Sequence, residues 1–289
     1  VFISLDTFVI SYNQGGAGEM DMSLFEEDLP EFTQPETGGE EHTEAVNYPI
    51  VTENSYIDKH YSIEISELYQ YDTLIHIAKV KLDSARYLKC AFADDTYGKN
   101  VKPTTSDPAE QHGAILAVNG DYYGAREKGI VIRNGVLYRS EPDELDLLCI
   151  YADGSFKIYK SGERTAEELM NEKVWQCLTF GPGLIDGGEI TVTADQEVGN
   201  AMVSNPRTAI GVLDDLSYVF IVSDGRTEES EGLSLRQLAE VMKQLGAKIA
   251  YNLDGGGSST MYFNGEIINK PTTYGEFHER RVSDIVYIR

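Results

Sequence analysis

Residues 249–260 read IAYNLDGGGSST, an apolar strand that runs directly into an acidic residue, three glycines and three hydroxyl side chains. Upstream, Tyr218–Val222 has the Val-, Ile- and aromatic-rich composition of a second strand. Between the two, Ser234 is a good N-cap, apolar residues then recur at helical spacing, and Gly246 stands where a helix commonly ends. The order strand, helix, strand predicts a βαβ unit near the C-terminus with parallel neighbouring strands.

Short apolar runs bounded by Gly, Asn or Asp recur through the chain from Tyr56 onward and predict further strands. A second short helix is expected over Ala166–Glu172, and Asp153-Gly154 is a hairpin turn signal. Many strands with few helices predict the α+β class, a mixed β-sheet domain with a few flanking helices. The other predicted strands are Ile75–Leu82, Tyr87–Ala93, Ile115–Val118, Gly129–Arg133, Leu147–Tyr151, Phe156–Tyr159 and Ile285–Ile288.

The charge of the chain limits what it can bind. The 289 residues carry a formal charge of −24, and residues 1–45 contain 11 acidic residues but no Lys or Arg. A field of this sign opposes non-specific binding to nucleic acid or anionic lipid, so nucleic acid is excluded as a partner. An anionic substrate would have to be held against this field by a local cluster of arginines or backbone N–H groups.

The acidic N-terminal region differs in composition from the rest. Residues 1–47 are predicted to form a flexible stalk, with an acidic partner-binding tail as the alternative, and residues 48–289 a single domain. No run in the chain is long enough to cross a membrane. Because the chain starts at Val1 rather than Met, we expect an upstream signal or anchor to have been removed. The three widely spaced cysteines are expected to be buried thiols.

Three predicted strands run directly into polar segments. Ile115–Val118 leads to Asn119-Gly120-Asp121, Tyr218–Val222 to Ser223-Asp224-Gly225-Arg226, and Ile249–Leu253 to the glycine-rich loop. Each segment alone is compatible with an ordinary turn. Because ligands bind at the carboxyl ends of strands in α/β units, the three together favour a site.

The loop after Leu253 is the strongest of these signals. Asp254 is followed by Gly255, Gly256 and Gly257, which let backbone N–H groups approach a ligand closely, and then by Ser258 and Ser259. Such donors suit a phosphate or an oxyanion. The chain contains neither GxxxxGK[ST] nor GxSxG, so the loop is neither a Walker loop nor a nucleophile elbow.

Arginines near these segments are candidates for holding an anion. Arg207 begins a predicted strand and has the fork geometry that suits phosphate, and Arg226 and the pair Arg280-Arg281 are further candidates. Their alternative is an ordinary surface position. A metal is the rival hypothesis for the carboxylates Asp254, Asp224 and Asp121, whose oxygens could bind Ca²⁺ or Mg²⁺, but no EF-hand pattern and no paired histidines are present, and no cofactor is expected.

At these positions the sequence resembles the phosphodiester glycosidase family. The matching segments, in the right order over residues 110–289, are AVNGDYY (117–123), NPRTAIG (205–211), VSDGR (222–226), NLDGGGSST (252–260) and RVS (281–283). Asp121 is a departure, because many relatives have a second glycine there. The resemblance implies hydrolysis of a sugar–phosphate linkage in a bacterial cell-envelope glycan by an exported protein, with the acidic stretch as a spacer.

In this hypothesis Arg207, Arg281 and the amides of Gly255–Ser259 stabilise the departing phosphate. One carboxylate acts as base or nucleophile at the anomeric carbon, with Asp254 or Asp224 favoured over Asp121. Asn119 and Asn252 orient sugar hydroxyls or water, and Gly120 and Arg226 contribute to substrate binding. The alternative is a binding module that retains an anionic cell-surface polysaccharide without cleaving it, and a cell-wall scaffold is a weaker third possibility.

Overall fold

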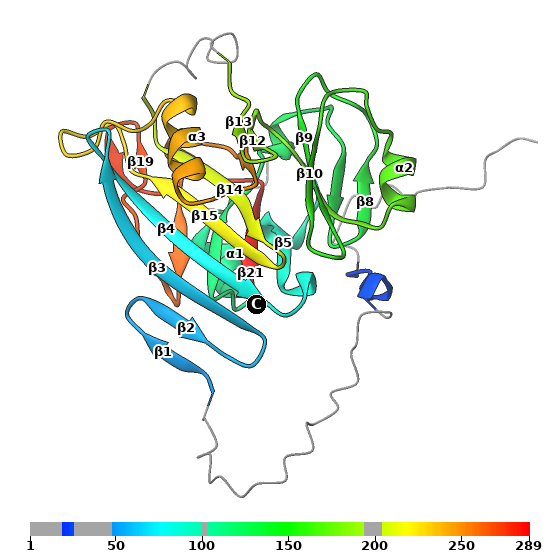
Figure 1. Ribbon diagram of the computed structural model, residues 1–289, viewed down its shortest axis with the longest axis horizontal. Coiled ribbons are helices and arrows are strands. Elements are labelled where there is room, and N and C mark those ends of the chain that lie inside the picture. Colours follow the sequence, from blue (N-terminus) through cyan, green and yellow to red (C-terminus); the bar gives the residue numbers. More distant parts are fainter. Residues whose placement is uncertain (1–18, 26–47, 100–102, 194–203) are drawn as a thin grey trace, which may run out of the picture.

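Antiparallel sheets make up most of the computed structural model, which describes residues 19–25, 48–99, 103–193 and 204–289 (Figure 1). The largest sheet has nine strands, in the order β1 (Ile50–Thr52), β2 (Ser55–Ile57), β3 (Tyr61–Gln70), β4 (Thr73–Leu82), β15 (Ser217–Ser223), β14 (Arg207–Asp214), β16 (Ile249–Asn252), β12 (Gly183–Asp186) and β13 (Glu189–Ile190).

Two five-stranded sheets and a small hairpin complete the described strands. One sheet has the order β10 (Phe156–Tyr159), β9 (Leu147–Tyr151), β11 (Val174–Thr179), β7 (Val131–Arg133), β8 (Val136–Arg139). The other has the order β18 (Glu266–Ile267), β17 (Met261–Phe263), β6 (Leu116–Asn119), β21 (Asp284–Ile288), β5 (Leu88–Phe92). The hairpin pairs β19 (Thr272–Thr273) with β20 (Glu276–Phe277).

The prediction of a mixed sheet is wrong, because every strand pair in the described residues is antiparallel. The predicted βαβ unit is also wrong in one respect. Strands β15 and β16 do run in the same direction with a helix between them, but they are not neighbours, since β14 lies between them and pairs antiparallel with both. The tight turn between β14 and β15 makes them a hairpin, and the helix then carries the chain over β14. The prediction of many strands and few helices is confirmed.

The helices are α1 (Ser106–Gln111), α2 (Ala166–Asn171) and α3 (Leu235–Gln244). The helix α3 forms where its sequence signals place it. The hydroxyl of Ser234 accepts a hydrogen bond from the backbone N–H of Gln237, whose side chain bonds back to the backbone N–H of Ser234, a complete capping box. Gly246 has a φ of +90°, the left-handed conformation that ends many helices. All the predicted strands and both predicted helices are confirmed to within a few residues.

The sheets share one core. Ile210 and Phe220 of the nine-stranded sheet pack in a single buried cluster with Leu148 of the β9 sheet and with Leu116 and Val286 of the β6 sheet. The opposite face of the nine-stranded sheet is covered by α3, as Figure 1 shows. Cys90, Cys149 and Cys177 are buried free thiols, as predicted.

Most of the predicted stalk lies outside the described residues. Within it, residues 19–25 are described and include a 3₁₀ turn at Met22–Phe25. The ring of Phe25 packs edge-on against Trp175, with centroids 4.8 Å apart, so this short segment lies on the domain. None of the described helices is both long and apolar enough for a bilayer span.

We expect Leu238→Ala to lower the free energy of unfolding by about 2–5 kcal/mol, because Leu238 is fully buried between α3 and the sheet and its truncation leaves a cavity. Arg236→Ala, two residues earlier on the exposed side of the same helix, is expected to change it little. Urea unfolding followed by circular dichroism measures both, and equal effects of the two substitutions would contradict the packing described for α3.

Candidate functional site

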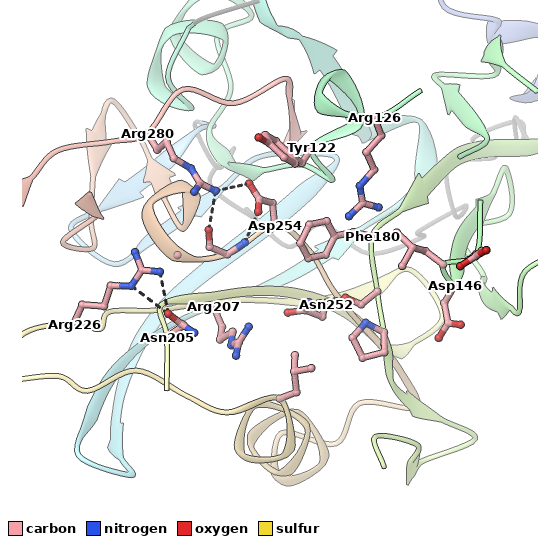
Figure 2. Close-up of a pocket in the computed structure, with 17 residues that line it drawn as sticks. Tyr122, Arg126, Asp146, Phe180, Asn205, Arg207, Arg226, Asn252, Asp254 and Arg280 are labelled. Carbon is pink, nitrogen blue, oxygen red and sulfur yellow. Dashed lines mark hydrogen bonds and ion pairs between the residues drawn. The ribbon is translucent and has the colours of Figure 1, made fainter. Parts of the chain in front are cut away.

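A pocket of about 860 Å³ opens where β14 begins and where β15 and β16 end. Because β14 is antiparallel to its neighbours, its first residue lies beside the last residues of the other two, with Arg207 opposite Ser223. Loops close the remaining sides, as Figure 2 shows. The lining residues are Tyr122, Arg126, Glu144, Leu145, Asp146, Phe180, Gly181, Pro182, Asn205, Arg207, Arg226, Leu235, Asn252, Asp254, Gly255, Gly256 and Arg280.

Asp254 is the most buried carboxylate of the lining, with 7% of its surface exposed. Its Oδ2 forms an ion pair with Nη2 of Arg280 at 3.0 Å, and Nε of Arg280 donates to the hydroxyl of Ser258 at 2.9 Å. Burial raises the pKa of the Asp254 carboxyl above its ordinary value, while the charge of Arg280 opposes that rise. The ion pair with Arg280 thus fixes the direction of the buried carboxylate.

Four arginines line the same pocket, although the chain as a whole is strongly acidic. Arg226 donates from Nε and Nη2 to Oδ1 of Asn205, at 3.2 and 2.9 Å. Nε of Arg207 donates to the carbonyl of Leu233 at 2.9 Å. Figure 2 shows the guanidinium groups of Arg207, Arg226 and Arg280 on the side of Asp254 away from Phe180. Such a cluster can hold an anion against the field of the protein.

The backbone amides of the glycine loop are mostly engaged within the loop and with its neighbours. The N–H of Gly255 donates to Oδ1 of Asp254 at 2.9 Å, and that of Gly256 to the carbonyl of Pro206 at 2.8 Å. The N–H groups of Ser258 and Ser259 donate to carbonyls three residues before them. The loop therefore shapes the floor of the pocket, and the arginine side chains supply most of the donors.

The two asparagines of the predicted site have different positions. Asn119 is fully buried outside the lining, where its Nδ2 donates to the Asp254 carbonyl at 2.6 Å and its Oδ1 accepts from the hydroxyl of Thr208 at 2.8 Å. Asn252 lies in the pocket wall, and its Nδ2 donates to the carbonyl of Gly181 at 2.7 Å. Asn119 therefore supports the glycine loop from behind, whereas Asn252 faces the cavity.

The sequence model of the family described as phosphodiester glycosidase matches residues 112–289, which is more than half of the chain and includes every residue that lines this pocket. The chain belongs to the phosphodiester glycosidase family.

Known proteins agree with this membership. The chain is 27% identical over 206 residues to the mouse N-acetylglucosamine-1-phosphodiester alpha-N-acetylglucosaminidase, covering 65% of this chain and 40% of the relative. It is 26% identical over 179 residues to the SPbeta prophage-derived uncharacterized protein YomE of Bacillus subtilis (strain 168), covering 60% of this chain and 28% of the relative. The chain thus spans less than half the length of the curated relatives it matches.

Two solved structures have the same fold. The catalytic domain of the zebrafish N-acetylglucosamine-1-phosphodiester alpha-N-acetylglucosaminidase superposes with a TM-score of 0.63 at 20% identity, covering 79% of this chain and 82% of that one. A putative exported protein of Burkholderia pseudomallei K96243 superposes with a TM-score of 0.59 at 15% identity, covering 75% and 74%. At these identities the likeness concerns the fold alone.

Asp121, a candidate carboxylate of the sequence analysis, lies in a fully buried ion cluster outside the pocket lining. Nη2 of Arg133 lies 3.0 Å from Asp121 and 2.7 Å from Asp284. The pKa of Asp284 is raised to about 7, mainly by burial. The positive charge of Arg133 lowers this pKa, and the negative charge of Asp121 raises it further. A Cβ on Gly120 would come within 2.1 Å of Asp284, so a glycine is needed where β6 leaves the sheet. This cluster ties β6, β7 and β21 together.

Asp224 also lies outside the lining. Its Oδ1 accepts from the backbone N–H of Lys270 at 2.8 Å, and its Oδ2 lies 3.5 Å from Nε2 of the buried His76. It therefore fixes the segment after β18 to the end of β15. Of the three carboxylates proposed from the sequence, the structure places Asp254 in the pocket and Asp121 and Asp224 in its support.

The remaining sequence-predicted residues divide in the same way. Arg207, Arg226, Asn252, Gly255 and Gly256 line the pocket, whereas Gly120, Gly257, Ser258 and Ser259 are buried outside the lining. Arg281 is exposed and outside the lining; its neighbour Arg280 makes the contact to Asp254. The sequence offers both arginines side by side, and only the structure shows that Arg280 is the one that turns inward, onto Asp254 and Ser258.

Several lining residues, among them Arg126, Asp146 and Phe180, lie outside every motif identified in the sequence. Arg126 and Phe180 come from loops outside the matching segments, and their side chains meet with the guanidinium carbon 5.1 Å from the ring centroid. Asp146 precedes β9 and pairs with Lys160 at 2.8 Å. In the described ranges, no three or more His, Cys, Asp or Glu side chains are grouped so as to hold a metal ion.

We expect Arg133→Met to lower the free energy of unfolding by about 3–5 kcal/mol, because it leaves two carboxylates buried without their cation. Arg164→Met, which removes an arginine paired with Glu172 near the surface, is expected to have a far smaller effect. Urea unfolding of both variants tests this, and a stable Arg133→Met protein would contradict a structural role for the Asp121 cluster.

Proposed function

We propose that the protein hydrolyses a glycosyl phosphodiester, a sugar linked through its anomeric oxygen to a phosphate. The observation that carries the proposal is the grouping of three arginines around one buried carboxylate, in the family-matched part of a strongly acidic chain. Membership of the phosphodiester glycosidase family and the printed activity of the mouse relative support this reaction class.

The leaving group determines what the pocket has to supply. A departing phosphomonoester is already a stable anion, so protonation of the leaving oxygen matters less than in ordinary glycosidases. In the proposed mechanism Arg207, Arg226 and Arg280 stabilise the negative charge of the phosphate as the bond to carbon breaks. Asp254 takes the proton of the water that attacks the anomeric carbon, which its burial-raised pKa favours. Asn119 acts through the glycine loop, as a positioning residue for Asp254.

The surroundings of the reaction are part of the same proposal. We propose that residues 48–289 work as one domain outside the cytoplasm on a phosphate-linked glycan of the cell envelope, with residues 1–47 as a spacer. The likeness to a putative exported protein of Burkholderia supports this. The rival hypothesis is that the protein retains such a glycan without cleaving it. The hydrolysis assay below distinguishes the two.

Wild-type protein is expected to release free sugar from at least one member of a panel of sugar-1-phosphodiesters, assayed by chromatography. Asp254→Asn should lower kcat/KM by about 10²–10⁴-fold, because the base is lost. Asp215→Asn, an exposed carboxylate in the turn between β14 and β15, at the other end of these strands from the pocket, is the matched control and should retain activity. Tight retention of a panel member without turnover by the wild type would favour the binding module, and full activity of Asp254→Asn would remove Asp254 from the mechanism.

Neighbouring arginines give a second matched pair. Arg280→Met should lower kcat/KM by about 10²–10³-fold, since it removes a charge from the phosphate and the partner of Asp254, whereas Arg281→Met should not. Arg280 lowers the pKa of Asp254, so its removal raises that pKa. Because Asp254 acts in its ionised form, the acid limb of the remaining kcat/KM profile should move to higher pH in Arg280→Met. An unmoved limb would mean that another group titrates there.

A further inference from the structure

The contacts among the lining residues divide the pocket into two ends. At one end, which we call the arginine end, Nη2 of Arg280 donates to the carbonyl of Gly255 at 3.2 Å. A Cβ on Gly256 would lie 2.9 Å from Nη2 of Arg226, and a Cβ on Gly255 would lie 3.9 Å from Cδ of Arg207. These three arginines therefore gather on the two glycines that follow Asp254.

The other end, which we call the aromatic end, is built on the loop between β11 and β12. The ring of Phe180 lies under the guanidinium group of Arg126. The next residue, Gly181, accepts the hydrogen bond of Asn252, and a Cβ on it would lie 3.4 Å from Cβ of Asp146. Figure 2 shows Phe180, Asn252 and Asp146 together on the side of Asp254 opposite Arg226.

The two ends differ in charge. Among the lining residues, the arginine end has Arg207, Arg226 and Arg280 with one carboxylate, Asp254. The aromatic end has Arg126 with two carboxylates, Glu144 and Asp146. A phosphodiester carries one negative charge and needs several N–H donors, so it is favoured at the arginine end and disfavoured at the aromatic end.

Asn252 adds a hydrogen-bond acceptor to the aromatic end. Its amide orientation is forced, because the Gly181 carbonyl can only accept and so must face the NH₂ group. Oδ1 is buried and has no partner within the described residues, and the residue as a whole is 2% exposed. A buried acceptor without a donor is costly, and a ligand hydroxyl or amide N–H at this end would satisfy it.

We propose that the pocket accepts its substrate in one direction only, with the phosphodiester group at the arginine end and the sugar ring at the aromatic end against Phe180. A sugar hydroxyl or acylamino N–H donates to Oδ1 of Asn252, which makes Asn252 a specificity-determining residue. This inference rests on the proposed function for the identity of the ligand, but the direction of binding can be tested without turnover.

The test maps two fragments of the substrate onto the intact protein by ¹⁵N NMR of the arginine Nε–H and asparagine side-chain resonances. Dimethyl phosphate, a monoanionic diester, represents the phosphate half, and a small panel of methyl glycosides represents the sugar half. Arg126→Lys, Arg226→Lys, Arg280→Lys and Asn252→Gln assign the resonances by removing or moving one each.

Dimethyl phosphate is expected to shift the Nε signals of Arg226 and Arg280 and to leave that of Arg126 in place. At least one methyl glycoside is expected to shift the Arg126 signal and the Asn252 amide. Arg226→Met should weaken dimethyl phosphate binding about tenfold or more, a loss of ~1.4 kcal/mol, with the glycoside affinity unchanged. Phosphate shifts at Arg126, glycoside shifts at Arg226, or no response to either probe would each overturn the proposed direction.

These outcomes are separable from the activity itself. If both probes map as expected and no sugar-1-phosphodiester is hydrolysed, the direction of binding stands and the hydrolase proposal fails. If diesters are hydrolysed and the probes map to the opposite ends, the hydrolase proposal stands and the direction is wrong. A deoxy diester that lacks the donor facing Asn252 provides the kinetic counterpart. With the wild type, kcat/KM for the deoxy diester should be about tenfold lower than for the parent diester. With Asn252→Ala, the two diesters should have similar kcat/KM values.

Discussion

The amide group of Asn119 is the interaction on which the site depends. From the end of β6 it donates to the carbonyl of Asp254 and accepts hydrogen bonds from the hydroxyl of Thr208 in β14 and the backbone N–H of Thr260. One fully buried side chain thus joins the β6 sheet, the nine-stranded sheet and both ends of the glycine loop. Because each of these groups would otherwise be buried without a partner, the loop has one stable position relative to the sheets.

The partners of each buried or half-buried arginine determine whether its positive charge is available to an anion. Arg133 lies between two buried carboxylates that neutralise its charge, and it serves the fold. Arg226 donates to the neutral amide of Asn205, which fixes its direction without cancelling its charge. Arg280 is intermediate, since it shares its charge with Asp254. An arginine bound to a neutral amide can therefore still attract an anion, whereas an arginine bound to carboxylates holds strands together.

Local patterns in the sequence were sufficient to predict the strands and helices but not how the strands pair. The capping box at Ser234 and the apolar runs identify α3, β15 and β16. Nothing in those segments shows that β14, which precedes both, inserts between them, because strand order depends on contacts distant in sequence. The same limit applies to the site. The strand-end segments brought Asp254, Asn252 and Arg226 together, whereas Arg126 and Phe180 reach the pocket only through the packing of a separate sheet.

The antiparallel arrangement changes how a strand-end site is built. In a parallel sheet one edge collects only the carboxyl ends of strands, but here Arg207, the first residue of β14, lies between the ends of β15 and β16. The side chains that follow those ends must then turn back over β14 to reach the same cavity. Arg226, three residues after β15, does so with left-handed backbone at a φ of +62°, and Tyr122, which follows β6 of the neighbouring sheet, has a φ of +64°. Such conformations cost of order 1 kcal/mol or more each for residues other than glycine, and they persist only where the surroundings fix them. Both residues line the pocket, so at these two positions the surrounding structure holds a strained backbone that sets the direction of a side chain of the site.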